Sequence, residues 1–81
     1  MLEVAVLSPE ALLFNGRARH VILPGEQGVF EVWPFHRPVV SRLLPGFIVV
    51  DGQPFPIRRG VVKVEHDTVT AIVEADPDHA P

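Results

Sequence analysis

The sequence contains no cysteine, which excludes disulfides and thiolate metal sites within it. Its four histidines are scattered, and none stands two or four residues from another, the local spacing on which three-histidine metal sites usually draw. No serine lies in a nucleophile-elbow motif, and the nearest pair of carboxylates, Asp76 and Asp78, stands close to the C-terminus. We therefore expect no metal, no cofactor and no enzymatic activity.

The chain is also poor in lysine and in long apolar runs. Lys63 is the only lysine, and ten acidic residues outweigh seven basic ones to give a net charge of −3. Nucleic-acid-binding domains carry a basic surface, so no nucleic-acid partner is expected. The longest apolar run is four residues, which is too short for a membrane span. Met1 is followed by Leu2 and Glu3 rather than by the basic and apolar segments of a signal peptide.

What the chain does contain is turn-forming and strand-forming residues. Nine prolines and six glycines in 81 residues argue against helices, whereas β-branched residues at alternating positions favour strands. The hairpin signals are Asn15-Gly16, Asp51-Gly52 and His66-Asp67. The expected strands are 2–7, 11–14, 17–23, 29–33, 39–44, 47–50, 53–58, 61–65 and 68–74.

Turn signals thus recur between short strands, at a spacing typical of sandwiches and barrels. The prediction is an all-β fold, a flattened β-sandwich or barrel of about 8–10 short, mostly antiparallel strands. We expect a single domain over residues 1–76 and a disordered tail over 77–81. Structural turns are expected at Gly16, Pro24, Gly25, Pro34, Pro38, Gly46, Gly52 and Gly60.

The segment 24–28 has the glycines of a phosphate-binding loop but lacks its other parts. No lysine or hydroxyl residue follows it, no helix is expected to open after it, and Glu26 would repel an anion. We interpret it as a plain turn and expect no small-molecule substrate. Arg17 and Arg19 share one face of an expected strand, which is either a solvated face or a contact patch for an acidic partner.

An ordered set of motifs runs along the chain and resembles one family. The motifs are Phe14-Asn15-Gly16, Val21-Ile22-Leu23-Pro24-Gly25-Glu26-Gln27-Gly28, Trp33-Pro34-Phe35-His36-Arg37-Pro38, Leu43-Leu44-Pro45-Gly46 and Arg59-Gly60-Val61-Val62-Lys63-Val64. In order and spacing they are similar to those of the epsilon subunit of F-type ATP synthase, in its N-terminal β-sandwich domain. The chain departs from the family pattern at Glu31, Phe35, Arg59 and Val61.

Phe35 is the departure with the clearest structural consequence. It replaces a glycine that the family usually has before His36, and phenylalanine tolerates a positive φ poorly. The loop is therefore expected either to turn differently or to display an exposed aromatic side chain. Many family members also continue into an inhibitory C-terminal helical hairpin. A chain that is complete at Pro81 would be a short form that cannot inhibit ATP hydrolysis by that route.

The resemblance implies a non-catalytic rotor subunit of the central stalk, coupling the membrane c-ring to the gamma subunit during ion-driven ATP synthesis. It implies a peripheral position, through the complex, on the cytoplasmic side of a bacterial plasma membrane. The positions matching the c-ring interface are Glu26, Gln27, Gly28, Val29, Phe35, His36 and Arg37. Those matching the gamma interface are Ser8, Val39, Val40, Ser41 and Arg42.

Two other interpretations of the sequence remain open at this stage. A free-standing β-sandwich adaptor or ligand-binding module could use the same loops, and a small metal-dependent enzyme of barrel type is a weaker alternative. Co-purification with a gamma subunit separates the rotor subunit from the adaptor. A metal assay on the purified protein tests the enzyme.

Overall fold

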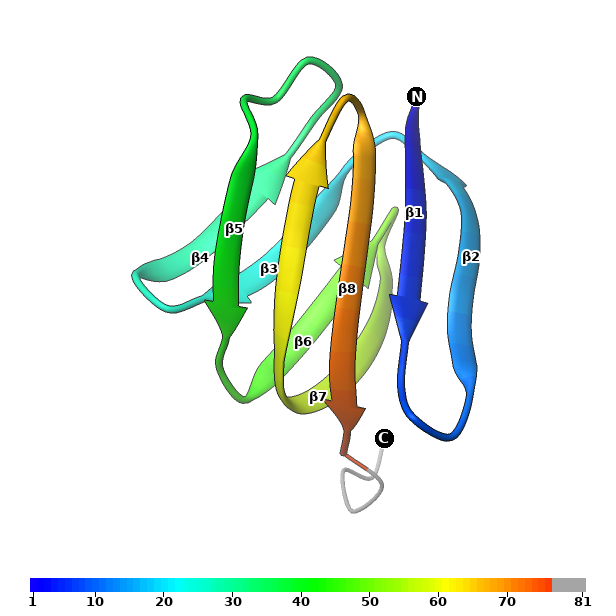
Figure 1. Cartoon of the computed structure of the whole chain (residues 1–81), viewed down its shortest axis with the longest axis vertical. Helices are drawn as coiled ribbons and strands as arrows, with labels where there is room; N and C mark the ends of the chain where they lie inside the picture. The colour runs from blue at the N-terminus through cyan, green and yellow to red at the C-terminus, as the bar shows by residue number, and fades with distance from the viewer. Residues whose placement is uncertain (77–81) are drawn as a thin grey trace.

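The computed structural model describes residues 1–76, which form eight β-strands in two packed layers (Figure 1). The strands are β1 (Leu2–Leu7), β2 (Leu12–Ala18), β3 (Val21–Gly25), β4 (Gly28–Val32), β5 (Val39–Leu43), β6 (Gly46–Val50), β7 (Gln53–Glu65) and β8 (Thr68–Ala75). The described part of the chain has no helix of the length and apolarity that a membrane crossing requires. The expected tail at 77–81 lies outside the described residues.

One layer has the strand order β2-β1-β8-β7-β5, and the other contains β4, β3, β6 and the first part of β7 (Figure 1). Neighbouring strands are antiparallel except β1 and β8, which pair in parallel. The prediction of a mostly antiparallel all-β sandwich is therefore confirmed.

Strand β7 belongs to both layers. Its residues 53–57 pair with β6, and its residues 60–64 pair with β5. The register against β8 shifts between Ile57 and Arg59, and a bulge of this kind bends a strand and increases its twist. Separate strands were expected at 53–58 and 61–65, and that division is wrong because the chain bends here without leaving the sheet.

The core lies between the layers and follows the alternation seen in the sequence. In β1 the side chains of Leu2, Val4 and Val6 are buried, as the alternation of that segment indicates. Strands β7 and β8 contribute valines at alternate positions in the same way. Among residues 1–76 the buried set contains no polar or charged residue, so burial of apolar surface is the main force that holds the layers together.

Two of the three hairpin signals form the turns that they predict. Asp51 and Gly52 have φ values of 45° and 85°, and His66 and Asp67 have φ values of 50° and 59°, as a type I′ turn requires. The Asp51 carboxylate accepts hydrogen bonds from the backbone N–H groups of Arg19 (3.0 Å) and His20 (3.1 Å). This contact ties the β6–β7 turn to the connection between β2 and β3.

The expected hairpin at Asn15-Gly16 is wrong. Both residues lie inside β2, where Asn15 pairs with Ala5 and Gly16 with Val4. The chain reverses earlier, between Ser8 and Ala11, where the Ala11 N–H donates to Ser8 Oγ (3.1 Å) and the Ser8 N–H to the Ala11 carbonyl (2.8 Å). A turn signal is local, and here the pairing of β2 along the whole of β1 outweighs it.

Three other expected turns lie inside strands. Pro24 and Gly25 end β3, paired with Val29 and Gly28, and the turn itself is at residues 26–27. Gly60 lies within β7, opposite Leu43 and Val73. Both glycines are needed for close packing: a Cβ at Gly25 would lie 2.7 Å from the Phe30 ring, and a Cβ at Gly60 would lie 2.7 Å from the Ile72 carbonyl oxygen. Pro34, Pro38, Gly46 and Gly52 stand in or beside connections between strands.

A group of ion pairs joins β7 to β8 near the bulge. Arg59 Nε lies 2.9 Å from Glu74 Oε2, and Arg58 Nη1 lies 3.6 Å from Glu74 Oε1. The hydrogen bond from Arg59, followed by the charge of that guanidinium, lowers the pKa of Glu74 from its ordinary value of 4.5. Because the pKa of Glu74 is lower in the folded state than in the unfolded state, the ionised Glu74 stabilises the fold. This stabilisation is complete above the unfolded-state pKa and is lost as pH falls through the folded-state pKa.

We predict that Arg59→Ala raises the pKa of Glu74 towards its ordinary value, because it removes the group that most favours the ionised carboxylate. The measurement is an NMR titration of the Glu74 side-chain carboxyl resonance in both proteins. Lys63→Ala is the matched control, since Lys63 pairs with Glu65 and not with Glu74. An unchanged midpoint in Arg59→Ala would contradict this assignment.

Candidate functional site

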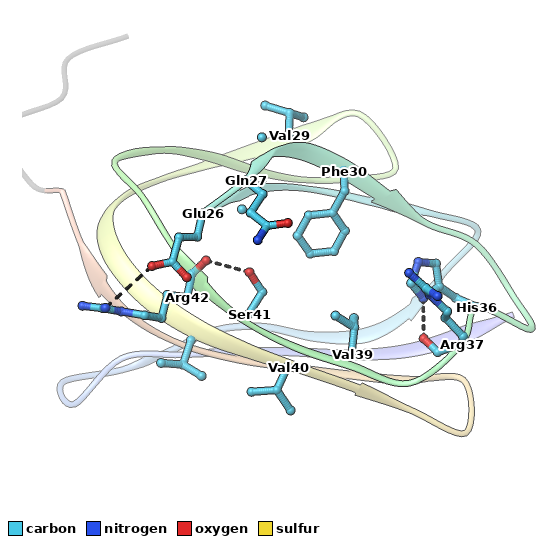
Figure 2. Close-up of a pocket in the computed structure, with 13 residues that line it drawn as sticks. Glu26, Gln27, Val29, Phe30, His36, Arg37, Val39, Val40, Ser41 and Arg42 are labelled. Atoms are coloured by element: carbon cyan, nitrogen blue, oxygen red, sulfur yellow. Dashed lines mark hydrogen bonds and ion pairs between the residues drawn. The ribbon is translucent and has the colours of Figure 1, made fainter.

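A hollow of about 530 Å³ opens on one side of the sandwich, between β4 and β5 (Figure 2). Strand β4 is the last strand of its layer, and β3 meets β5 only where Gly25 pairs with Leu43. The two layers therefore separate beyond this point, and the edges of β4 and β5 lie on opposite sides of the opening.

Ten of the twelve predicted interface residues line this hollow. They are Glu26, Gln27, Gly28, Val29, His36, Arg37, Val39, Val40, Ser41 and Arg42. Residues that the resemblance assigns to two different partners are thus neighbours around one opening. The c-ring candidates come from the β3–β4 turn, β4 and the β4–β5 loop. The gamma candidates come from β5.

The wall of the hollow is apolar near the core. Phe30 and Val39 are partly buried and pack against the core cluster, and the Phe30 ring lies in the middle of the opening in Figure 2. Val29 stands on the rim with 71% of its surface exposed, and Val40 on β5 is 69% exposed. Both valines alternate with inward-facing neighbours and point away from the opening in Figure 2, so they lie on the outer faces of β4 and β5.

Charged groups lie at the two ends of the opening. At one end Arg42 Nη1 is 3.7 Å from Glu26 Oε2, and both side chains are mostly exposed, so the pair contributes little to stability. At the other end lie His36 and Arg37, where His36 Nδ1 is 2.6 Å from the Arg37 carbonyl oxygen. Within residues 1–76 no three histidine, aspartate or glutamate side chains are grouped as a metal site would require. The arrangement is suited to recognition of a partner surface with polar groups around an apolar centre.

Phe35 lies in a tight turn beside the hollow. The His36 N–H donates to the Trp33 carbonyl (3.1 Å), Pro34 occupies the second position, and Phe35 has a φ of 68°. Proline at the second position and a positive φ at the third define a type II turn. The turn therefore keeps the positive φ, and the Phe35 side chain is 93% exposed, so of the two expected outcomes the structure has the exposed aromatic.

Ser8 is the predicted interface residue that lies apart from the others. It is in the β1–β2 turn, at the end of the molecule opposite the β4–β5 loop (Figure 1). Its hydroxyl contacts the backbone of Ala11. Strands β8 and β7 lie between β1 and β5, so any partner that contacts both Ser8 and β5 has to extend across this layer.

Two features near the Phe35 turn were not foreseen. Trp33 is 51% exposed, and its ring lies 4.7 Å from that of His20, centroid to centroid. His20 was expected on a strand face but lies in the connection before β3. Asp67, expected only as a hairpin residue, accepts a hydrogen bond from the Phe35 N–H (2.7 Å). The position of Trp33 beside Pro34 is a sequence signal for the exposed tryptophan. No local signal in the sequence indicates the hydrogen bond between Asp67 and Phe35.

The family described as the beta-sandwich domain of the ATP synthase delta/epsilon chain matches residues 1–75. The chain is 36% identical over 85 residues to an ATP synthase epsilon chain 2 of Burkholderia orbicola, an alignment that covers 98% of this chain and 53% of that protein. It is 38% identical over 78 residues to an ATP synthase epsilon chain of Nitratiruptor, covering 90% of this chain and 60% of that protein. The chain thus spans little more than half the length of these relatives.

A similar fold occurs in a solved structure of the central stalk and c-ring of the mitochondrial ATP synthase of Tetrahymena thermophila. The TM-score is 0.76 at 16% identity, over 90% of this chain and 63% of the matched chain. At this identity the likeness concerns the fold. The family predicted from the motifs is confirmed by the sequence match: this chain belongs to the family of the β-sandwich domain of the ATP synthase delta/epsilon chain.

Proposed function

We propose that this chain is a non-catalytic rotor subunit of an F-type ATP synthase, which joins the c-ring to the gamma subunit and transmits rotation between them. The observation that carries the proposal is the family match over residues 1–75, together with relatives that are named epsilon chains. In this role the protein is peripheral to the membrane through the complex, on the cytoplasmic side of a bacterial plasma membrane.

The geometry of the hollow supports two contact surfaces on one rigid body. The ring surface consists of residues 26–29 and 35–37, and the gamma surface consists of the outer side of β5 with Val40 and Arg42, extended to Ser8. A domain that transmits torque must not deform, and close-packed protein interiors have low compressibility. A permanent interface of this kind is expected to bury more than about 2,000 Å² in total.

The test of the proposal is co-purification. A tagged copy of the chain, expressed in its own host, is expected to carry the gamma subunit and the c-ring with it through affinity purification. Recovery of the tagged chain without either partner would contradict the proposal and would favour an adaptor that binds other proteins. Detection of the partners by mass spectrometry distinguishes these outcomes.

We predict that Arg37→Glu weakens attachment to the ring and leaves the isolated fold intact. Arg37 lies at the end of the hollow in an exposed loop, so reversal of its charge changes the contact surface without disturbing the core. Mutations of charged residues at interface rims act mainly on the association rate, and the loss is expected to grow as salt is lowered. The measurements are ring recovery at two salt concentrations and thermal unfolding of the isolated chain.

Arg17→Glu is the matched control for this charge reversal. Arg17 is exposed on β2, in a strand that does not line the hollow, so its reversal makes the same change in net charge elsewhere. Equal losses of ring recovery in the two variants would show a general effect of charge and would remove Arg37 from the contact surface.

A further inference from the structure

Asp67 connects three segments that are distant in the sequence. It lies in the β7–β8 turn with a φ of 59°, and its backbone carbonyl accepts the N–H of Glu3 at the start of β1 (2.8 Å). Its Oδ1 accepts the N–H of Phe35, 32 residues away, at 2.7 Å. A carboxylate acceptor at this distance makes a short, charge-assisted hydrogen bond.

The Phe35 N–H belongs to the peptide group between Pro34 and Phe35. The orientation of this central peptide group distinguishes type I from type II β-turns. Types I and II share φ at the second residue but differ in its ψ by a rotation of about 150°, which reverses the peptide between the second and third residues. In the turn from Trp33 to His36 this is the peptide between Pro34 and Phe35. Reversal of this peptide would point the Phe35 N–H away from Asp67 and end the hydrogen bond.

The local sequence favours the other turn. Type I accommodates most residues, whereas type II needs a positive φ at its third residue and normally has glycine there. Phe35 occupies that position with a φ of 68°. The hydrogen bond within the turn, from the His36 N–H to the Trp33 carbonyl, is compatible with both types and does not choose between them. Something outside the turn must therefore favour type II.

We propose that Asp67 is a positioning residue, which selects the type II turn at residues 33–36 and thereby holds Phe35 outward for contact with the partner. In the turn that this hydrogen bond accompanies, Phe35 is 93% exposed. The selection of the turn is a property of the isolated chain. Only the identity of the partner as the c-ring rests on the proposed function.

The test compares two variants of the full chain by NMR. Asp67→Gly removes the acceptor while glycine tolerates the positive φ of the β7–β8 turn, and Asp67→Asn keeps an acceptor oxygen in a residue that also tolerates this φ. In a type II turn the Pro34 Hα lies close to the Phe35 amide proton and gives a strong NOE, whereas in type I it does not. Amide exchange of Phe35 reports the hydrogen bond directly.

In Asp67→Gly the NOE is expected to weaken and exchange of the Phe35 amide to accelerate by about tenfold or more. In Asp67→Asn both are expected to stay close to those of the unmodified chain. Thermal unfolding of each variant shows whether the β7–β8 hairpin is intact. A folded Asp67→Gly chain that keeps the strong NOE and slow exchange would overturn the proposal.

Recovery of the c-ring by the same two variants tests the positioning role. Phe35→Ala removes the exposed ring and is expected to lose ring recovery; Asp67→Gly is expected to lose it likewise, and Asp67→Asn to keep it. One outcome would overturn the positioning role of Asp67: Phe35→Ala loses ring recovery, while Asp67→Gly has a changed turn and still recovers the ring fully. The orientation of Phe35 would then not matter for the contact. If Phe35→Ala also keeps full recovery, the assignment of Phe35 to the ring contact fails, and the NMR result still decides the turn.

Discussion

Replacement of Phe35 by glycine is expected to stabilise the isolated domain and, at the same time, to weaken the attachment to the c-ring that we propose for it. The backbone of Phe35 has a φ of 68°, in the left-handed region that costs a residue with a Cβ about 1–2 kcal/mol. Glycine removes this strain but loses about 0.5–1 kcal/mol more than other residues through conformational entropy. The expected net gain in the free energy of unfolding is up to about 1.5 kcal/mol, measured by urea denaturation.

The loss of attachment follows from the exposed side chain. Phe35 is 93% exposed in the isolated chain, and a buried aromatic at an interface contributes about 150–250 Å² of contact area. Truncation of such an anchor typically costs about 2 kcal/mol or more, equivalent to roughly 30-fold weaker binding. Ring recovery and the dissociation rate of the reconstituted complex measure the effect.

Phe35→Ala separates the two effects. It removes the same ring but keeps a Cβ at the positive φ, so it is expected to lose attachment without gaining stability. Attachment of Phe35→Gly equal to that of the unmodified chain would show that the side chain is not an anchor. A lower free energy of unfolding in Phe35→Gly than in Phe35→Ala would show that the turn stores no strain.

The second large effect is expected at Gly60, where alanine should destabilise the fold by about 2–3 kcal/mol. A Cβ there would lie 2.7 Å from the Ile72 carbonyl oxygen, 2.8 Å from Val73 Cγ1 and 3.1 Å from Val73 Cα. Two of these atoms are backbone atoms of the paired strand β8 and cannot move without breaking the register. A chain of this size has a total stability of about 4–12 kcal/mol, so the loss should lower the melting temperature by about 10 °C or more.

Gly16→Ala is the matched control, because Gly16 is also a strand glycine without a positive φ. Its added Cβ would meet only the Phe14 ring, at an ordinary distance of 3.4 Å. The change is expected to be neutral or stabilising by up to about 1 kcal/mol, since alanine has less entropy to lose on folding. Equal destabilisation by Gly60→Ala and Gly16→Ala would contradict the steric explanation. A large loss of stability in Gly16→Ala would instead favour the hairpin turn at Asn15-Gly16, which the structure excludes.

The strands could be predicted from the sequence because their signal is local. Apolar residues at alternate positions mark β1 and β8 whatever their partners are, and Asp51-Gly52 forms a turn since the strands on both sides pair with each other. The same reasoning fails at Asn15-Gly16. The strand that contains them pairs with β1, and nothing in those two residues indicates which segment will lie beside them.

The glycines show the same limit in another form. A glycine can be present because a turn needs a positive φ, as at Gly52, or because another chain segment passes too close for a Cβ, as at Gly60. The sequence looks alike in both cases, and only the position of β8 distinguishes them. The link from Asp67 to Phe35 was equally inaccessible, since it joins two turns whose proximity depends on the packing of the whole sandwich.

The parallel pairing of β1 with β8 has a consequence for how the protein is made. Among the strands of residues 1–76, β1 leaves the ribosome first, yet one of its two neighbours, β8, is the last of them to be synthesised. The layer that contains both cannot close until residue 75 has emerged, so nascent chains keep one edge of β1 unpaired until then. Chaperone binding to nascent chains should therefore persist until β8 has emerged and paired with β1.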